Sequence, residues 1–201
     1  MTEQGVDESK RSTLKRFAAL GAATPLVHLS TGDANDVRDA IVGYLASTPG
    51  AHFSKLRDDL QLGTGETQHH LRRLERDGVI EHRKDGEYKR YFPADRFSEF
   101  EQRALGYLRR ETPRKTLIAL LRDPDASGSE IAEAAAVSRS TISKAAAQLE
   151  SAGLLSRTDG YALRRPETLL TLVVRYADSF GADAVTFAGD ADEFVRYSPR
   201  R

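Results

Sequence analysis

The sequence contains one apolar pattern twice, and this repeat constrains the fold more than any other feature. When the chain is laid on itself with an offset of 75 residues, Leu56 aligns with Ile131 and Gly78 aligns with Gly153. The first copy reads LRDDLQLGTGETQHHLRRLERDGVIEHR, and the second reads IAEAAAVSRSTISKAAAQLESAGLLSR. A pattern of this length that recurs once indicates one supersecondary unit used twice. The 201 residues are therefore predicted to form two small domains rather than one large domain.

The first copy predicts three helices. Apolar residues at helical spacing indicate a helix over residues 35–46 and a short second helix over residues 53–61, which ends before Gly63. Thr64 is expected to cap a third helix through its hydroxyl group, and Gly78 is expected to end that helix. Two helices joined by a short turn around a glycine, after a supporting helix, form a helix-turn-helix.

A basic hairpin is predicted directly after the third helix. Residues 79–82 and 88–92 read as two strands, and residues 84–87 contain the Asp-Gly pair that favours a tight hairpin turn. Arg and Lys occur on both strands. A helix that can enter the major groove, followed by a basic hairpin that can lie along the phosphates, is a winged helix.

The second copy predicts the same elements in a smaller form. Thr112 is expected to cap its first helix. Ser127 and Glu130 have the spacing of a capping box for the second helix, and Ser138 or Ser140 can cap the third. A tighter wing is expected around the Asp-Gly pair at residues 159–160.

These patterns predict a mainly α protein with small β-wings. The predicted segments are an N-terminal arm at residues 1–32, a first winged-helix domain at 33–95, a connecting helix at 96–111, a second winged-helix domain at 112–165 and a C-terminal helical segment at 166–201. Apolar residues of the last segment recur every three or four positions, which predicts either a dimer face or a face packed on the second domain. These candidates for the dimer interface are Leu169, Leu172, Val173, Tyr176 and Phe180.

Composition narrows the classes of function. The 30 basic side chains balance the 30 acidic ones, so any contact with nucleic acid must come from local patches rather than from the net charge. The chain has no cysteine, which excludes disulfides and thiolate metal sites and fits a reducing, cytoplasmic environment. No phosphate-binding glycine loop, H-E-x-x-H or G-x-S-x-G motif is present, so neither an enzyme nor a cofactor is predicted.

Polar and basic side chains concentrate where the two winged helices would meet duplex DNA. Gln and Arg are the side chains that make bidentate contacts to adenine and guanine, whereas Arg and Lys on a wing suit phosphates. In the first copy the candidate DNA contacts are Gln68, His69, Arg72, Arg73, Arg83, Lys84, Lys89 and Arg90. In the second copy they are Arg139, Ser140, Thr141, Ser143, Lys144, Gln148 and Arg157, with Arg164 and Arg165 on or beside the wing.

Other interpretations of these residues stay open. Charge on a helix surface ordinarily serves solvation, and winged helices also occur as protein-interaction modules. His69 and His70 are adjacent on a helix and point about 100° apart, so no shared metal site is predicted, and His70 is expected in the core or at a cap. A protein-binding adaptor without specific DNA binding is therefore the alternative function.

The N-terminal arm raises the question of export. Residues 9–15 read SKRSTLK and precede an Ala-rich run, which resembles a twin-arginine signal with Lys10 in place of the first arginine. The apolar run at residues 17–29 is too short to span a bilayer and contains Pro25. The main prediction is therefore a protein without a membrane partner. An exported or membrane-associated protein, directed by this N-terminal segment, is the second alternative function.

The two third-helix segments resemble known regulators. QHHLRRLERDGVI is similar to the recognition-helix segment of ArsR-type winged helices, and SRSTISKAAAQLESAGLL is similar to that of the MarR type. The pair resembles the tandem winged-helix transcriptional regulators of archaea over about residues 35–166. This resemblance implies a regulator that binds specific double-stranded DNA, commonly as a homodimer with recognition helices in successive major grooves. The thiolate ligands of metal-sensing ArsR proteins are absent, so metal sensing is not implied.

Overall fold

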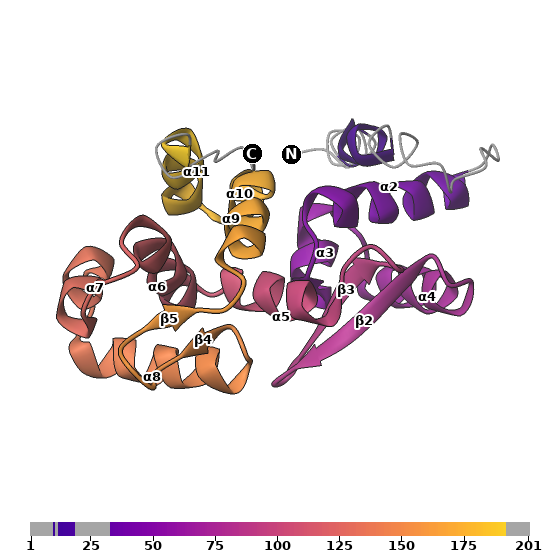
Figure 1. Ribbon diagram of the computed structural model, residues 1–201. Helices are drawn as coiled ribbons and strands as arrows, with labels where there is room; N and C mark the ends of the chain where they lie inside the picture. Colours follow the sequence, from indigo (N-terminus) through magenta and orange to yellow (C-terminus); the bar gives the residue numbers. More distant parts are fainter. Residues whose placement is uncertain (1–9, 11, 19–32, 192–201) are drawn as a thin grey trace, which may run out of the picture. The chain divides into compact units, whose positions relative to one another are not determined.

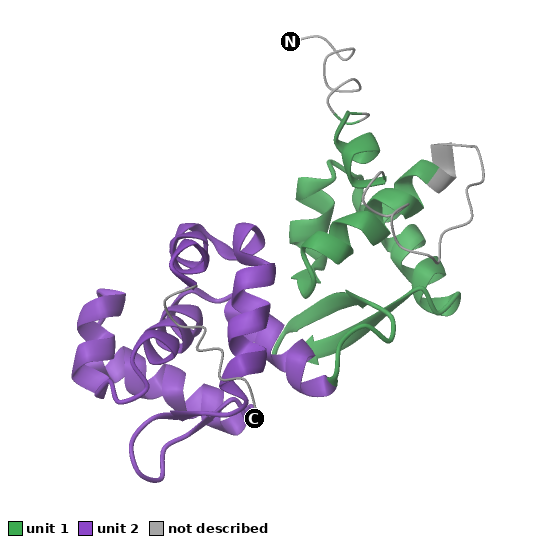
Figure 2. Cartoon of the chain, turned by 45° about the horizontal axis from the view of Figure 1, so that its top comes forward, with its two compact units in different colours: residues 1–98 green, residues 99–201 purple. Residues whose placement is uncertain are grey.

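The computed structural model describes residue 10, residues 12–18 and residues 33–191. These residues fall into two compact units, residues 1–98 and residues 99–201, and each unit is described by itself (Figure 2). The finer boundaries expected for the individual domains stay predictions.

Much of the predicted N-terminal arm lies outside the described residues. Residue 11 and residues 19–32 belong to that part, so the export-like motif and its apolar run are not described as a whole. Residues 12–18 are helical. Among the described residues, no helix combines the length and the apolar content needed to span a bilayer.

Besides the helical segment at residues 12–18, the described part of unit 1 contains three helices and a small sheet (Figure 1). Its elements are α2 (Asp33–Ser47), β1 (Ala51–His52), α3 (Phe53–Asp59), α4 (Thr64–Arg76), β2 (Ile80–Asp85) and β3 (Tyr88–Pro93). The order of α2, α3 and α4 followed by the β2–β3 hairpin is that of a helix-turn-helix with a wing. Its helical segments follow the apolar spacing of the sequence.

The core of unit 1 forms where the three helices meet the sheet. Four aliphatic side chains of this core are at most 2% exposed: Ile41 and Leu45 of α2, Leu56 of α3 and Leu71 of α4. The helical segment at residues 12–18 adds to this cluster through Leu14. Burial of four such aliphatic side chains stabilises the unit by roughly 1.5–3 kcal/mol each. This core holds α4 in place and leaves its opposite face to solvent.

The sheet of unit 1 has three strands rather than the two expected. The strand order is β1-β3-β2, and both pairs are antiparallel. Asp85 pairs with Tyr88, so the hairpin loop consists of Gly86 and Glu87. Gly86 has φ of 62°, which is the left-handed conformation that a two-residue hairpin loop requires. The short strand β1 makes β3 the central strand and ties the base of the hairpin to the start of α3.

Unit 2 repeats the three-helix arrangement and adds helices around it (Figure 1). Its elements are α5 (Glu99–Leu108), α6 (Glu111–Arg122), α7 (Gly128–Ala135), α8 (Arg139–Ser151), β4 (Leu155–Ser156), β5 (Ala162–Leu163), α9 (Pro166–Arg175), α10 (Ala177–Phe180) and α11 (Ala182–Gly189). Helices α6, α7 and α8 pack together around Leu117, Ile131 and Ile142, which are at most 1% exposed. The pair β4–β5 forms a wing of two residues per strand.

The outer helices of unit 2 are fixed by both apolar and polar contacts. Helix α5 packs on α6 and α9, and α11 packs on α6 and α9. Arg114 on α6 is 8% exposed, and its Nε donates to Asp183 of α11 at 3.0 and 2.9 Å. Because this guanidinium is largely withdrawn from water, the Asp183 carboxylate is needed to compensate its charge. The C-terminal helices are thus part of the second compact unit.

The apolar stripe of α9 does not form a free face. Its members Leu169, Leu172, Val173 and Tyr176 are between 0 and 5% exposed, because they pack inside unit 2. Phe180 is half-buried, and the Arg109 guanidinium lies 4.9 Å from its ring centroid. The sequence left two uses open, and the four buried members of the stripe pack within unit 2. The dimer face stays a prediction.

Two helix caps differ from the expected ones. Thr64 is the first residue of α4, and the N-cap is Gly63, whose N–H donates to the Glu66 carboxylate at 3.1 Å. Helix α6 begins at Glu111 with Arg110 as its N-cap, so Thr112 lies inside the helix. At α4 the acceptor is thus a carboxylate three residues further along the chain, whereas Arg110 makes no side-chain cap hydrogen bond at α6. The Ser127–Glu130 capping box and the Ser138 cap occur as predicted.

Candidate nucleic-acid interface

Helix α4 presents a polar face because its apolar face is fixed in the core of unit 1. Thr67, His70, Leu71 and Leu74 are buried, and the Thr67 hydroxyl donates to the Gly63 carbonyl oxygen at 2.9 Å. This spacing of three and four residues turns the intervening side chains outward. The exposed residues of this face are Gln68, His69, Arg72 and Arg73. All four are among the predicted DNA contacts.

The acidic side chains of α4 are engaged by neighbouring groups. Glu66 accepts from Lys10 at 3.1 Å, and Asp77, directly after the helix, pairs with Arg38 at 2.9 Å. Glu75 lies 2.6 Å from His82 Nδ1 and 2.9 Å from Lys89 Nζ, both on the hairpin. Each of these carboxylates therefore has a cationic or donor neighbour, which reduces its repulsion of a phosphate. Arg72 makes no hydrogen bond or ion pair with any described residue.

The Glu66 carboxylate stabilises the start of α4 in its ionised form. Burial raises its pKa, but the hydrogen bonds from the Gly63 N–H and from Lys10 outweigh burial and hold the pKa below its ordinary value. A negative charge in the first turn is also attracted to the positive end of the helix dipole, which stabilises the helix. Glu66 is therefore a capping residue of α4 rather than part of its DNA-facing set.

His70 belongs to the core. It is 8% exposed, and burial, followed by the nearby His69, lowers its pKa. A neutral imidazole is therefore favoured at this position. Within the described residues no three His, Asp or Glu side chains are grouped closely enough to hold a metal ion.

The wing of unit 1 carries three of its four predicted cations at the surface. Lys84 is exposed, whereas Arg83 and Lys89 are half-exposed, and Lys89 pairs with Glu75. Tyr88, at the start of β3, is 52% exposed and was not among the predicted residues. Its ring lies 5.1 Å from His52, so it forms part of an aromatic surface at the side of the hairpin. The alternation of β3 does not predict its exposure, because Arg90 and Phe92 at the same alternate positions are buried.

Arg90 has a different place from the one predicted. It is 4% exposed, its Nε donates to Asp85 at 2.5 Å, and its Nη1 donates to the Gly50 carbonyl oxygen at 3.1 Å. The position is buried because β1 covers this side of the central strand, and β1 was not expected from the sequence. Arg90 thus joins the hairpin to the segment before α3, and we leave it out of the proposed DNA contacts.

Helix α8 of unit 2 presents a polar face with no carboxylate in its first nine residues. Ser138 caps the helix, with its Oγ accepting from the Thr141 N–H at 3.2 Å, and both Ser140 and Thr141 place their hydroxyls 2.8 Å from it. Ile142, Ala145, Ala146 and Leu149 are buried. The exposed residues are Arg139, Ser140, Ser143, Lys144 and Gln148, and Thr141 is half-buried.

The wing of unit 2 is short and holds its cation close to α8. The Arg157 Nε donates to Glu150 at 2.7 Å, and the Arg157 N–H donates to the same carboxylate at 3.0 Å. The side-chain hydrogen bond is the main cause that lowers the pKa of Glu150. Arg157 is therefore exposed but already paired, which makes it a weaker candidate for a phosphate contact than Arg139 or Lys144.

Comparisons with known proteins match two separate parts of the chain. Residues 35–105 match a family described as an N-terminal helix-turn-helix domain, and residues 114–165 match the MarR family. The chain is 33% identical over 90 residues to an uncharacterised HTH-type transcriptional regulator of Methanocaldococcus jannaschii. The aligned part is 45% of this chain and 22% of that relative, so the chain spans less than a quarter of the relative's length. No solved structure matches the chain significantly.

These matches agree with the architecture described above. The predicted mainly α fold with tandem winged helices is confirmed, and so is the resemblance to archaeal regulators of this type. The chain carries two winged helix-turn-helix domains in tandem, an N-terminal HTH domain followed by one that matches the MarR family.

Proposed function

We propose that the chain is a transcriptional regulator that reads specific double-stranded DNA through α4 and α8, with the wings on the phosphates. The observation that carries the proposal is the composition of the exposed face of α8. From Arg139 to Gln148 this face offers two cations, hydroxyl groups and one amide, and no carboxylate. Arg and Gln in a major groove can make bidentate contacts to guanine and adenine, each worth about 1–3 kcal/mol of discrimination.

The face of α4 supports the same function. Gln68 and Arg72 are exposed one helical turn apart, and the acids of this helix are engaged by Lys10, Arg38 and the hairpin. The chain as a whole is neutral, so binding by charge alone is not expected to be strong. Specific contacts to bases would then supply a larger share of the affinity.

The experiment that tests this function is selection of bound sequences from a random duplex pool with the full chain, repeated at two salt concentrations. An enriched sequence that survives the higher salt is the expected result. Failure to enrich any sequence, together with weak binding that salt abolishes, would overturn the proposal. It would favour a protein-binding adaptor instead, for which the neutral net charge is the supporting observation.

Two variants locate the contact in unit 1. We expect the double charge reversal Arg72→Glu and Arg73→Glu to weaken binding of the selected duplex by at least about tenfold. The control reverses Lys15 and Arg16, another adjacent and exposed basic pair, on the helical segment that packs against α2. Because both doubles change the net charge equally, only a contact at α4 separates them. Equal affinities of the two variants would remove α4 from the interface.

A homodimer in the cytoplasm forms part of the proposal. The resemblance to MarR-type regulators supports the dimer, and because the stripe of α9 is buried within unit 2 we expect the contact to lie elsewhere. Light scattering of the full chain, with and without the selected duplex, measures the oligomeric state. A monomer that binds one unsymmetrical sequence would show that the two tandem domains set the spacing of the site without a second copy.

A further inference from the structure

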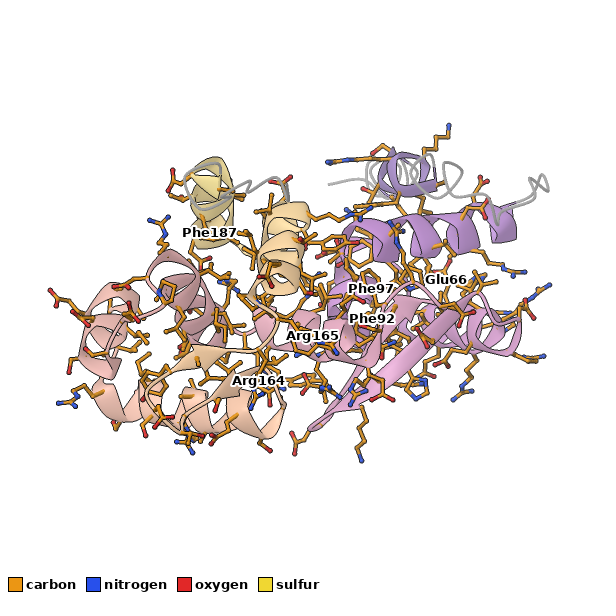
Figure 3. The ribbon with its side chains drawn as sticks, viewed as in Figure 1. Glu66, Phe92, Phe97, Arg164, Arg165 and Phe187 are labelled. Carbon is orange, nitrogen blue, oxygen red and sulfur yellow. The ribbon has the colours of Figure 1, made fainter. Side chains whose placement is uncertain are left out.

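A hollow lined by arginine side chains lies within unit 2, beside the wing. It has a volume of about 710 Å³ and is bounded by α5, the end of α8, the wing and the link from β5 to α9. The three arginines are Arg103 of α5 and Arg164 and Arg165 of the link. Figure 3 labels the two arginines of the link. None of the residues proposed to read bases lines this hollow. Arg164 and Arg165 lie beside the wing that is proposed to contact phosphates, so the experiment has to distinguish a ligand site from a contact to the DNA backbone.

The three guanidinium groups are only weakly compensated. Arg103 lies 3.4 Å from Glu99, whose side chain is 81% exposed, and the buried Nε of Arg103 has no hydrogen-bond partner among the described residues. The Arg164 and Arg165 side chains form no ion pair with any described residue. A buried N–H donor without an acceptor is costly, so the Arg103 guanidinium is incompletely satisfied by Glu99.

The polar groups of the hollow include one carboxylate, and it is already bound. Glu150 accepts from both the side chain and the backbone of Arg157, so its carboxylate is engaged away from the three lining arginines. The hydroxyls of Ser156 and Thr158 lie 3.2 Å apart on the wall of the wing. Three guanidinium groups and two hydroxyl groups provide hydrogen-bond donors for several oxygen atoms of one anionic group.

The wall also holds one arginine in a fixed position. Arg165 adopts φ of 51° and ψ of 58°, a left-handed conformation that a residue with a Cβ rarely adopts. Its guanidinium lies 5.0 Å from the centroid of the Phe100 ring on α5. The ring thus lies within cation–π distance of this guanidinium on one side of the hollow.

We propose that this hollow binds a small molecule carrying a phosphate monoester. Arg164 and Arg165, which have no ion pair with any described residue, together with Arg103 match a dianion better than a monoanion. A phosphate monoester carries a charge of about −1.5 to −2 at pH 7 with three acceptor oxygens. Leu155 supplies an apolar wall for the remainder of the ligand. The same phosphate chemistry could also be supplied by the DNA backbone, and the experiment separates the two sources.

The test titrates the full chain with glycerol 3-phosphate at constant ionic strength, without DNA, and follows the Nε–Hε resonances of the arginines and the backbone amides of Ser156 and Thr158 by NMR. Saturable shifts of the Arg103 and wing signals are expected, with no response to glycerol. Arg103→Gln and, separately, Arg164→Gln should each weaken binding by at least about tenfold. Arg164 is exposed, so its replacement tests the site without disturbing the core.

The matched control is Arg175→Gln, an exposed arginine of α9 outside the hollow, which should bind like the unaltered chain. Shifts that rise linearly with glycerol 3-phosphate and are the same in all variants would overturn the proposal. A separate titration with a duplex supplies the second check: a response of the Arg103 and Arg164 signals to the duplex but not to the ester would also overturn the proposal, because that result assigns these arginines to DNA. The titration with the ester contains no DNA, so its outcome does not depend on the function proposed above.

Discussion

Individual charged residues near α4 have opposite uses that their types do not reveal. Arg72 and Arg90 are both arginines predicted to contact DNA, yet Arg72 is exposed without an ion pair to any described residue and Arg90 is 4% exposed. The difference follows from β1, which covers one side of β3 and encloses the Arg90 side chain between Asp85 and the Gly50 carbonyl. Position in the sheet therefore decides which cation can reach a phosphate.

We expect Arg90→Ala to lower the free energy of unfolding of unit 1 by about 3 kcal/mol, because it removes the buried partner of Asp85. Hydrogen exchange of peptides from unit 1, measured by mass spectrometry on the full chain, reports this unit separately. The control is Arg83→Ala, since Arg83 faces Arg90 across the hairpin and is less buried. It should change the stability by less than about 0.5 kcal/mol. Similar losses in both variants would contradict the role given to Arg90.

His70 makes the stability of unit 1 depend on pH. Its pKa is lowered in the folded state, mainly by burial, so below about pH 6.5 the unfolded chain binds a proton that the folded chain resists. Stability is then present above this pH and is lost as the pH falls. We expect His70→Leu to lose less stability between pH 7 and pH 5 than the unaltered chain, measured by hydrogen exchange of unit 1. The control is Gln68→Leu, at an exposed position two residues before His70. This variant should show the same dependence of stability on pH as the unaltered chain.

At the scale of elements, α4 and the wing of unit 1 are connected by one side chain. Glu75, near the end of α4, contacts His82 on β2 and Lys89 on β3 at 2.6 and 2.9 Å. A recognition helix and a wing that are held together in this way would approach a groove and its phosphates as one body. Neither an isolated α4 nor an isolated hairpin could form this contact, because Glu75 lies on the helix and its partners lie on the strands.

Glu75→Gln should loosen the hairpin while leaving α4 formed. We expect exchange of the β2 and β3 amides to speed up about fivefold, which corresponds to about 1 kcal/mol, the upper range for a partly exposed ion pair. Glu87→Gln is the control, because Glu87 lies in the exposed hairpin loop. If exchange in the hairpin is unchanged by Glu75→Gln, the wing is held by its backbone hydrogen bonds alone.

The sequence predicted the helices better than the sheet. Helical spacing, the Ser127–Glu130 capping box and Pro166 at the start of α9 are local signals, and each is present in the structure. A strand as short as Ala51–His52 carries no periodicity, so β1 was missed, and with it the burial of Arg90. The cap at Gly63 was missed because its acceptor is a side chain three residues away, which competes with the more familiar cap by a threonine.

At the scale of the whole molecule, a neutral net charge is combined with polar exposed faces on α4 and α8. The apolar stripe of α9 shows a limit of sequence patterns at this scale, because a buried face and a dimer face have the same spacing. Only the packing of α9 within unit 2 distinguishes them. The residues proposed to contact DNA stay predictions until binding is measured.

If both units bind one duplex, their contributions to the salt dependence should add. For the selected duplex, each phosphate contact contributes about −0.9 to the slope of log K against log salt. We expect Lys84→Ala in unit 1 and Lys144→Ala in unit 2 each to make the slope shallower by about 0.9, and the double variant by the sum. Fluorescence anisotropy of the labelled duplex measures these slopes. A double variant no shallower than one of the singles would show that one unit binds alone.

The way in which the hairpin of unit 1 is anchored has a thermodynamic consequence. Arg90 on β3 is hydrogen-bonded to the Gly50 carbonyl oxygen, and Lys89 on β3 is paired with Glu75 of α4. Both contacts exist without a bound duplex. A wing that is already ordered loses little conformational entropy on binding, in contrast to a basic arm that folds on the DNA. Calorimetry should therefore find a heat-capacity change set by the area of the contact alone, without the additional burial that accompanies folding.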